Sequence, residues 1–305
     1  MIYIFGCSMS NWYWPTWVDW LRLYYNQPVT NLAYKGHGNQ TIYWNILENI
    51  KTFTSDDHLM IMWTENHRLN YWYDKEWIDN NDVLGFFPNK QGKLWFTKDR
   101  PFTGLFKVHP EFQPSFTHMI IDLMQVIFQT QLLLDKVGCK YTMAMVGSPW
   151  RNTSPIYLPK FETRWQNKKE TNEYEIANAH SILDLAPINS LISNINWNKF
   201  ANPPQDPFDP KNYSGLWEYT SSKKEFVVLQ HNSDHHPNPL VHHDYLIEKI
   251  LKQEPSKAKH RNLARQIAED SMTLDIPTFT SDDFVFTGNK PLLDSKYKEL
   301  LESAR

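Results

Sequence analysis

The residue most suited to chemistry lies near the start of the chain, where the apolar stretch MIYIFG runs directly into Cys7 and Ser8. A serine at the end of a buried strand can act as a nucleophile, but its hydroxyl is barely ionised at neutral pH. A histidine must take its proton, and a carboxylate commonly orients that histidine. The segment LQHNSDHHPNPLVHHDYL supplies both groups in Asp234 and His236. Pro237 restricts the backbone of His236 to extended conformations, which suits a base held on a short loop.

Alternating strands and helices are expected to position these residues. The pattern predicts strands at 1–6, 28–33, 57–64, 140–147 and 225–230, and helices at 15–26, 36–53, 115–138 and 238–253. This alternation predicts an α/β fold of three layers, α/β/α, with a mainly parallel sheet. Ligands bind such sheets at the carboxyl ends of the strands. Ser8, Gly36 and Asn66 each follow a predicted strand, so we expect them to share one edge of the sheet.

The length of 305 residues allows one large domain or two smaller ones. We predict one domain over 1–254, interrupted by inserts at about 66–115 and 148–222 that lack a clear period. Residues 255–305 are predicted to form a helical C-terminal extension. Long segments without periodicity are usually functional or carry small structures of their own.

Composition narrows the classes of function. Hydrophobic residues make up 41% and charged residues 21%, which is typical of a globular protein, and the net charge of -3 disfavours nucleic acid and anionic membranes as partners. The two cysteines form neither a disulfide framework nor a metal-binding pair. No signal peptide or transmembrane segment is evident, so a cytoplasmic or virion-associated location is expected.

Three spaced blocks resemble those of the SGNH, or GDSL, family of hydrolases: GCS after the first strand, NLAYKGHGN, and SDHHPNPLVHH. The family nucleophile follows the first strand, which corresponds to Ser8. The second block has an Asn and, five residues later, a Gly, matched here by Asn31 and Gly36. The last block holds an Asp and a His before a Pro, matched by Asp234 and His236.

The resemblance implies a fold and an activity. The fold would be the SGNH hydrolase type, with a flavodoxin-like strand order. The activity would be that of a serine esterase acting on a carboxylic ester through Ser8, His236 and Asp234, without metal or cofactor. The backbone N–H groups of Ser8 and Gly36 would contribute to the oxyanion hole. The aromatic content of 15% suggests an O-acetyl ester on a carbohydrate as the substrate class.

The chain departs from the family pattern in three places. Cys7 replaces the usual Asp of the first block, the Asp-x-His spacing is shorter than in many members, and the block Gly-x-Asn-Asp is absent. Instead, MWTENHR follows the third strand and resembles a variant group with a downstream arginine, here Arg68. Two residues therefore stay open as the side-chain donor of the oxyanion hole, Asn39 and Asn66.

Simpler interpretations exist for several of these residues. Asn39 is also a good N-cap for the helix at 36–53, and Cys7 suits a small buried position. Arg68 is a candidate for binding a substrate carboxylate or phosphate, or for a structural ion pair. A metal site is disfavoured because the clustered histidines lack the spacing of convergent ligands. These histidines are His231, His235, His236, His242 and His243.

A second hypothesis places the protein in another class. The SGNH scaffold would then be a binding or structural module with a weakened site, for example a component of a phage particle. The missing block and the long inserts favour this hypothesis, and a composition rich in Asn, Lys, Trp and Tyr resembles that of bacteriophage proteins. The partners would be a small-molecule or glycan ester in the first case, and further copies or a particle assembly in the second.

Overall fold

A parallel sheet of four strands lies at the centre of the protein, with the order β2-β1-β3-β6. The strands are β1 (Ile2–Phe5), β2 (Val29–Asn31), β3 (His58–Trp63) and β6 (Lys140–Met145). The computed structural model describes residues 1–12, 14–25, 27–34, 37–66, 68–72, 93–97, 116–150, 179, 181–228, 236–252 and 258–272, with backbone only at 68–72, 93–97 and 227–228. The sheet confirms four of the predicted strands and the α/β class.

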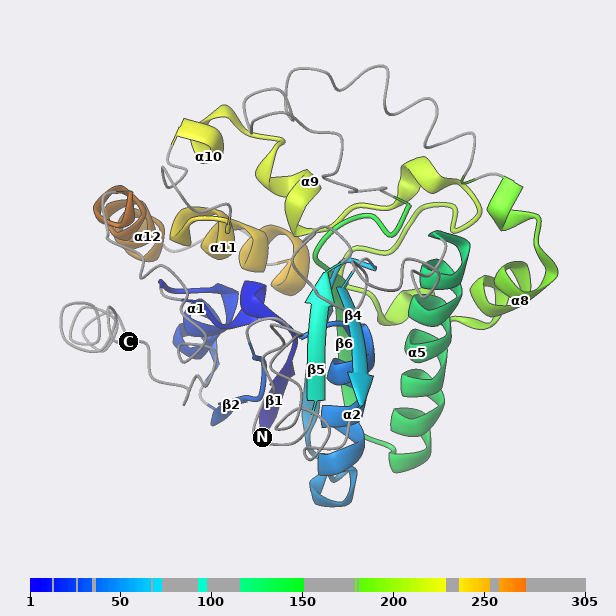
Figure 1. Ribbon diagram of the computed structural model, residues 1–305. Coiled ribbons are helices and arrows are strands. Elements are labelled where there is room, and N and C mark those ends of the chain that lie inside the picture. The colour runs from blue at the N-terminus through cyan, green and yellow to red at the C-terminus, as the bar shows by residue number, and fades with distance from the viewer. Residues whose placement is uncertain are drawn as a thin grey trace, which may run out of the picture.

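Helices cover both faces of this sheet (Figure 1). The α-helices are α1 (Trp17–Tyr24), α2 (Asn39–Asn49), α5 (Phe116–Val137), α8 (Ala186–Asn194), α9 (Leu216–Thr220), α10 (Lys224–Val228), α11 (Pro239–Tyr245) and α12 (Ala258–Ser271). Short 3₁₀ turns are η1 (Ser8–Ser10), η2 (Ile50–Thr52), η5 (Trp197–Lys199) and η6 (Pro210–Asn212), and a π-helical segment, η7 (Leu246–Leu251), continues α11. The predicted helices at 15–26, 115–138 and 238–253 are confirmed within slightly different bounds.

The central strand β3 is apolar on both sides because it is buried on both sides. Met60 and Met62 pack in the core that includes α1, α11 and α12. Leu59 and Ile61 alternate with them and pack in the core that includes α2, α5 and α8. This alternation follows from the two-residue period of a strand, and it divides the interior into two cores.

The three strand pairings within this central sheet are parallel, so the carboxyl ends of its four strands lie at one edge. Phe5 at the end of β1 is opposite Ile61, and Trp63 at the end of β3 is opposite Met145. The loops that carry Ser8 and Asn66 leave the sheet at this edge, as predicted from the sequence. Gly36, the third residue of that prediction, lies outside the described residues.

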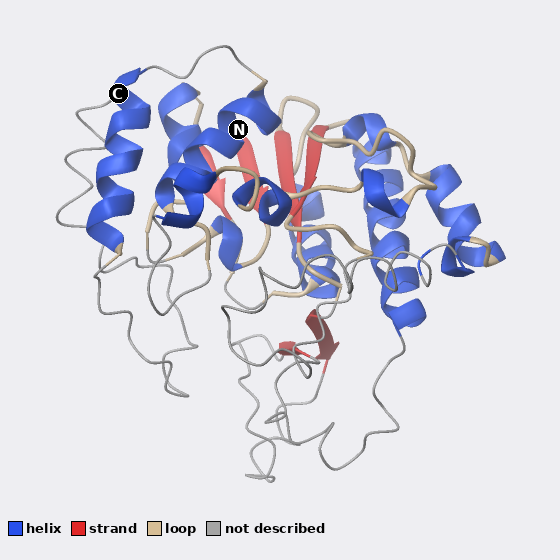
Figure 2. Ribbon diagram, turned by 90° about the horizontal axis from the view of Figure 1, so that it is seen from above, coloured by secondary structure: helices blue, strands red, loops and turns tan. Residues whose placement is uncertain are grey.

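A separate antiparallel pair lies within the insert at 66–115 (Figure 2). It consists of β4 (Arg68–Trp72) and β5 (Lys93–Thr97), with Arg68 opposite Thr97.

From the C-terminal region, α12 contributes Ala264 and Ile267 to the same core as α1 and α11. The first helix of that region is therefore part of the sheet domain's packing.

The strand predicted at 225–230 is wrong, because residues Lys224–Val228 form the helix α10. A short apolar run cannot be assigned to strand or helix from periodicity alone. The helical turn buries Phe226 completely, while its neighbour Glu225 faces α12 and binds two arginines there. In the described part of the chain, His236 therefore lies between two helices, α10 and α11.

The N-cap predicted at Asn39 is also wrong. Gly38 occupies the cap position in extended conformation, and Asn39 is the first residue of α2. Its side chain is used for a different contact, with the loop after β3. By contrast, the N-cap predicted at Asn238 is confirmed, since its side chain accepts a hydrogen bond from the Val241 N–H.

Candidate active site

Ser8 and His236, which are 228 positions apart in the sequence, form a hydrogen bond. The distance between Ser8 Oγ and His236 Nε2 is 2.8 Å. This lies within the range of a nucleophile and its general base, about 2.6–3.2 Å. In the tautomer with an unprotonated Nε2, the serine hydroxyl donates and the imidazole accepts. The pair can therefore transfer a proton directly.

A tight turn at the end of β1 positions Ser8. A Cβ added to Gly6 would lie 2.6 Å from Ser10 Oγ and 3.3 Å from the Met62 carbonyl oxygen, so only glycine fits where the chain leaves the sheet. The turn is closed by a hydrogen bond from the Ser10 N–H to the Cys7 carbonyl, and Cys7 itself is fully buried, as predicted for this residue. The Ser8 N–H is the first of η1, a position without an acceptor inside the helix.

Tryptophans hold the loop of His236 against the loop of Ser8. The ring of Trp12 stacks on the His236 imidazole, with centroids 3.4 Å apart and an angle of 18° between the planes. Trp14 donates its Nε1–H to the Pro237 carbonyl at 2.8 Å. Both indoles lie within six residues of Ser8, so the segment that supplies the nucleophile also orients the base.

Asn238 links the two ends of the segment that carries His236. Its Nδ2 donates to the Phe226 carbonyl in α10 at 3.1 Å, while its Oδ1 accepts from the Val241 N–H in α11 at 3.0 Å. One buried amide thus joins the helix before the loop to the helix after it. Because these bonds lie on either side of residues 227–237, they set the positions from which His236 must reach Ser8.

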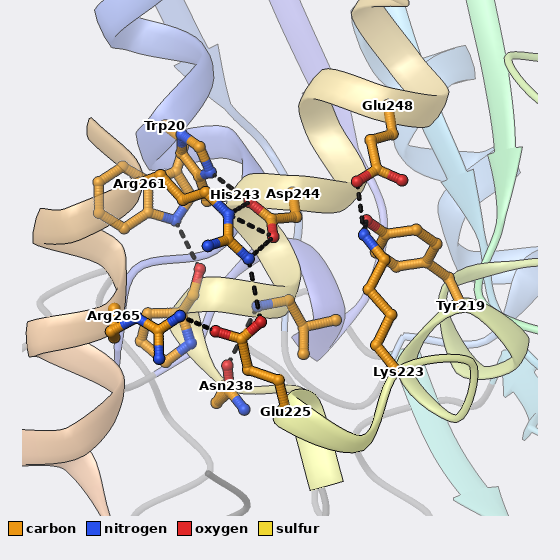
Figure 3. A network of polar contacts seen from close by, with 12 residues as sticks. Trp20, Tyr219, Lys223, Glu225, Asn238, His243, Asp244, Glu248, Arg261 and Arg265 are labelled. Carbon is orange, nitrogen blue, oxygen red and sulfur yellow. Dashed lines mark hydrogen bonds and ion pairs between the residues drawn. The ribbon is translucent and has the colours of Figure 1, made fainter. Parts of the chain in front are cut away.

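An ion network from α12 strengthens the same junction (Figure 3). Arg261 makes ion pairs with Asp244 of α11 at 2.8 Å and with Glu225 of α10 at 3.1 Å. Asp244 is only 3% exposed and also accepts a hydrogen bond from His243 Nδ1 at 2.9 Å. Arg265 adds a second, more exposed ion pair to Glu225. A single arginine of α12 therefore connects both helices that flank the loop.

The electrostatics of this network favour charged groups in the interior. Burial by itself would raise the pKa of Asp244, but hydrogen bonds from His243 and Arg261 outweigh it and the pKa lies below its ordinary value. Hydrogen bonds to Asp244 raise the pKa of the Arg261 guanidinium. Burial, followed by the charge of Asp244, raises the pKa of Tyr24 to about 12, and its hydroxyl lies 3.2 Å from His243 Nε2.

Both candidates for the side-chain donor of the oxyanion hole are buried near the carboxyl edge of the sheet. Asn39 exchanges two hydrogen bonds with the backbone of Thr64, at 3.1 Å and 2.8 Å, and joins α2 to the loop after β3. Asn66 donates to the Pro149 carbonyl at 2.8 Å and joins that loop to the one after β6. Each amide carries a second N–H, so these contacts do not decide between the two residues.

Several predicted site residues are not tested by this geometry. Asp234 and Gly36 lie outside the described residues, as do His231 and His235 of the histidine cluster. Arg68 begins β4, but only its backbone is described. His242 and His243 are fully buried in α11. Within the described part of the chain, no three His, Cys, Asp or Glu residues gather in a way that could hold a metal ion.

The sequence interpretation missed the residues that orient the base. Trp12 and Trp14 stand in the run NWYWPTWVDW, directly after the nucleophile, and this density of tryptophan was an available signal. The pairing of Asp244 with Arg261 left no comparable signal, because nothing in the spacing of these two residues marks them as partners.

Comparisons with known proteins add no assignment for this chain. No protein-family model matches it, and no curated protein sequence matches it significantly. Among the helices that the structure describes, none is long and apolar enough to cross a membrane.

Proposed function

We propose that the protein is a serine esterase of the SGNH hydrolase type that hydrolyses carboxylic esters. The hydrogen bond of 2.8 Å between Ser8 Oγ and His236 Nε2 is the observation that carries this proposal. The strand order β2-β1-β3-β6 supports it, because it corresponds to the first four positions of the flavodoxin-like order. Three motif blocks of the sequence supply the resemblance to this family.

The proposed reaction begins when Ser8 Oγ attacks the ester carbonyl carbon and its proton passes to His236 Nε2. The tetrahedral intermediate collapses to an acyl-serine, and the imidazolium returns the proton to the departing alkoxide. A water molecule then attacks the acyl-serine, with His236 again as the base, and releases the carboxylic acid. Asp234 is proposed to orient the imidazole through Nδ1, by resemblance to the family.

Charge that develops on the carbonyl oxygen needs hydrogen-bond donors. We assign this role to the N–H groups of Ser8 and Gly36, together with the amide of Asn39 or Asn66. Removing one such donor typically raises the barrier by about 2.7–4 kcal/mol. Asn39→Ala and Asn66→Ala therefore distinguish the two candidates. Substitution of the residue that donates to the oxyanion should lower kcat far more than substitution of the other.

An O-acetyl group on a carbohydrate is the substrate class that we propose to test first. Support comes from the aromatic content of the chain, since aromatic rings provide flat surfaces for sugars. Release of acetate from a panel of acetylated glycans tests this assignment separately from the esterase activity itself.

The decisive experiment combines hydrolysis of p-nitrophenyl acetate with labelling by a fluorophosphonate, which bonds covalently to an activated serine. Wild-type protein should react in both assays, and Ser8→Ala should lose both while unfolding at an unchanged urea concentration. Ser10→Ala is the matched control, because Ser10 lies in the same turn but accepts a hydrogen bond from Trp17 instead. It should remain labelled.

Full hydrolysis by Ser8→Ala would show that the assignment is wrong. A wild-type protein that neither hydrolyses the ester nor reacts with the probe would favour the second hypothesis, a binding or structural module built on the same scaffold. We also propose that Arg68 contacts an acidic group of the substrate. Arg68→Met should then raise KM only for substrates that carry a carboxylate or a phosphate.

A further inference from the structure

Trp12 forms one wall of the site around His236. Its ring lies parallel to the imidazole at a centroid distance of 3.4 Å, and it is only 4% exposed. Trp14 makes an edge contact with this ring, with centroids 6.3 Å apart and planes at 76°. The imidazole thus rests on an indole whose own orientation is constrained by packing.

The backbone that carries Trp12 is itself well anchored. Asn11 donates from Nδ2 to the Ala33 carbonyl at 2.9 Å, and Asn31 donates from Nδ2 to the Ser10 carbonyl at 2.8 Å. These bonds join the segment after Ser8 to the end of β2 and to the residues that follow it. A ring on such a segment can hold its neighbour in one plane, since the second side-chain torsion of histidine is otherwise broad.

Two physical effects follow from the stack. Fixing the ring plane keeps Nε2 directed at Ser8 Oγ, which is needed for proton transfer. The face of an indole also attracts a cation, so the imidazolium that forms during attack is stabilised relative to the neutral ring. The second effect is larger in the transition state, where the imidazolium forms, than before the proton is transferred.

We propose that Trp12 is a positioning residue of the Ser8–His236 pair, which holds the imidazole in plane and favours its protonated form during catalysis. The catalytic part of this inference rests on the proposed esterase function, whereas the effect of the ring on protonation of His236 does not. Among the described residues, Ser8 Oγ is a polar group that faces Nε2, at 2.8 Å. Asp234, the carboxylate implied by the family resemblance, lies outside the described residues.

The test uses Trp12→Leu, which keeps an apolar side chain but removes the aromatic face, and Trp12→Phe, which keeps a smaller face. Trp197→Leu is the matched control, because Trp197 packs against the core that includes α2, α5 and α8, where it contacts Phe200 and Tyr213. Two readouts are compared across pH in the full-length chain. The first is hydrolysis of p-nitrophenyl acetate, and the second is the NMR titration of ¹³C-labelled histidine, with the His236 signal assigned through His236→Gln.

Trp12→Leu should lower kcat by about 5- to 30-fold with KM nearly unchanged, as expected for the loss of a cation–π contact in the transition state. The His236 titration and the acid limb of the rate profile should both move to lower pH, by about half to one unit. Trp12→Phe should fall between wild type and Trp12→Leu. Trp197→Leu should reduce stability without moving either midpoint.

A folded Trp12→Leu with wild-type kcat and an unmoved His236 titration would overturn the inference. If that variant does not fold, Trp12→Phe decides, because an unmoved titration in it has the same meaning. A wild-type protein without esterase activity, combined with a titration that moves as expected, would refute the esterase function and leave the stacking effect intact. The two claims are thereby separated.

Discussion

The two halves of the candidate active site are held in different ways. Ser8 follows a strand of the central sheet, and its position is set by the register of β1 and by a turn that only Gly6 allows. His236 lies between two helices, and its position is set by side chains: the indoles of Trp12 and Trp14 and the amide of Asn238. The nucleophile depends on local backbone geometry, whereas the base depends on distant contacts.

The two halves of the site should therefore differ in their sensitivity to substitution. Backbone hydrogen bonds of a buried parallel sheet are hard to remove by a point mutation, so the position of Ser8 should tolerate most substitutions around it. The position of His236 depends on a few side chains, two indoles and an amide among them, each of which can be removed separately. Substitutions in α11 and α12 should therefore affect the base without moving the nucleophile.

The largest effect is expected for the base itself. His236→Gln removes the proton acceptor of Ser8, and kcat/KM should fall by about 10⁴-fold or more. The unfolding free energy should change little, because the ring is partly exposed. Hydrolysis of p-nitrophenyl acetate and urea unfolding measure the two quantities. Activity within tenfold of wild type would contradict the role of His236.

Arg261→Met should cause the largest loss of stability in the network of Figure 3. The change leaves Asp244 buried without its cation, which typically costs about 3–5 kcal/mol. Urea unfolding followed by circular dichroism measures the loss. Activity should fall as well, since the helices on both sides of the His236 loop lose their common partner.

Arg265→Met is the matched control for that experiment. Among the described residues Arg265 makes an ion pair with Glu225, and both side chains of this pair are substantially exposed to solvent. Exposed ion pairs contribute about 0–1 kcal/mol, so a small change is expected. Equal losses in the two variants would show that burial of Asp244 is not the source of the effect.

Asn238→Ala should destabilise the protein by about 2 kcal/mol, because it removes both the cap of α11 and the link to α10. Asn194→Ala is the control, since its amide also donates to a backbone carbonyl but is exposed at the end of α8. That variant should unfold within about 0.5 kcal/mol of wild type. Comparable losses of unfolding free energy in the two variants would mean that the link between α10 and α11 made by Asn238 contributes nothing to stability.

The smallest effect concerns pH. Asp244 has a lowered pKa in the folded protein, so its contribution to stability is complete above its ordinary value, about 4, and is lost as the pH falls through the folded value. Arg261→Met removes that contribution at neutral pH. The stability difference between wild type and this variant should therefore narrow by about 1 kcal/mol from pH 6 to pH 3. A difference independent of pH would contradict the charged state of Asp244.

Much of the fold could be predicted from local sequence. The strands at 1–6 and 57–64 were identifiable because a buried parallel strand is apolar throughout. Asn238 was identifiable as a cap because its type and its proline neighbour are typical of a helix start. The run at 225–230 was not identifiable, because its four consecutive apolar residues suit a short buried helix as well as a strand.

The site shows the same division. Ser8 and His236 were predicted as partners from motif blocks, and the structure brings them together. Asn39 was predicted as a cap, but its amide instead joins α2 to the loop after β3. Whether Asp234 and Gly36 complete the site stays a prediction.

Local sequence was enough to identify the four segments that form the central sheet and the serine that follows the first of them, although it also predicted a strand where α10 forms. Only the tertiary structure decided which tryptophan faces the imidazole, and that one arginine of α12 binds the helices on both sides of the His236 loop. The two kinds of feature differ in how far apart in the sequence the interacting residues lie. Strand pattern and capping depend on neighbours within a few positions, whereas ring stacking and buried ion pairs depend on residues that meet only when the chain has folded.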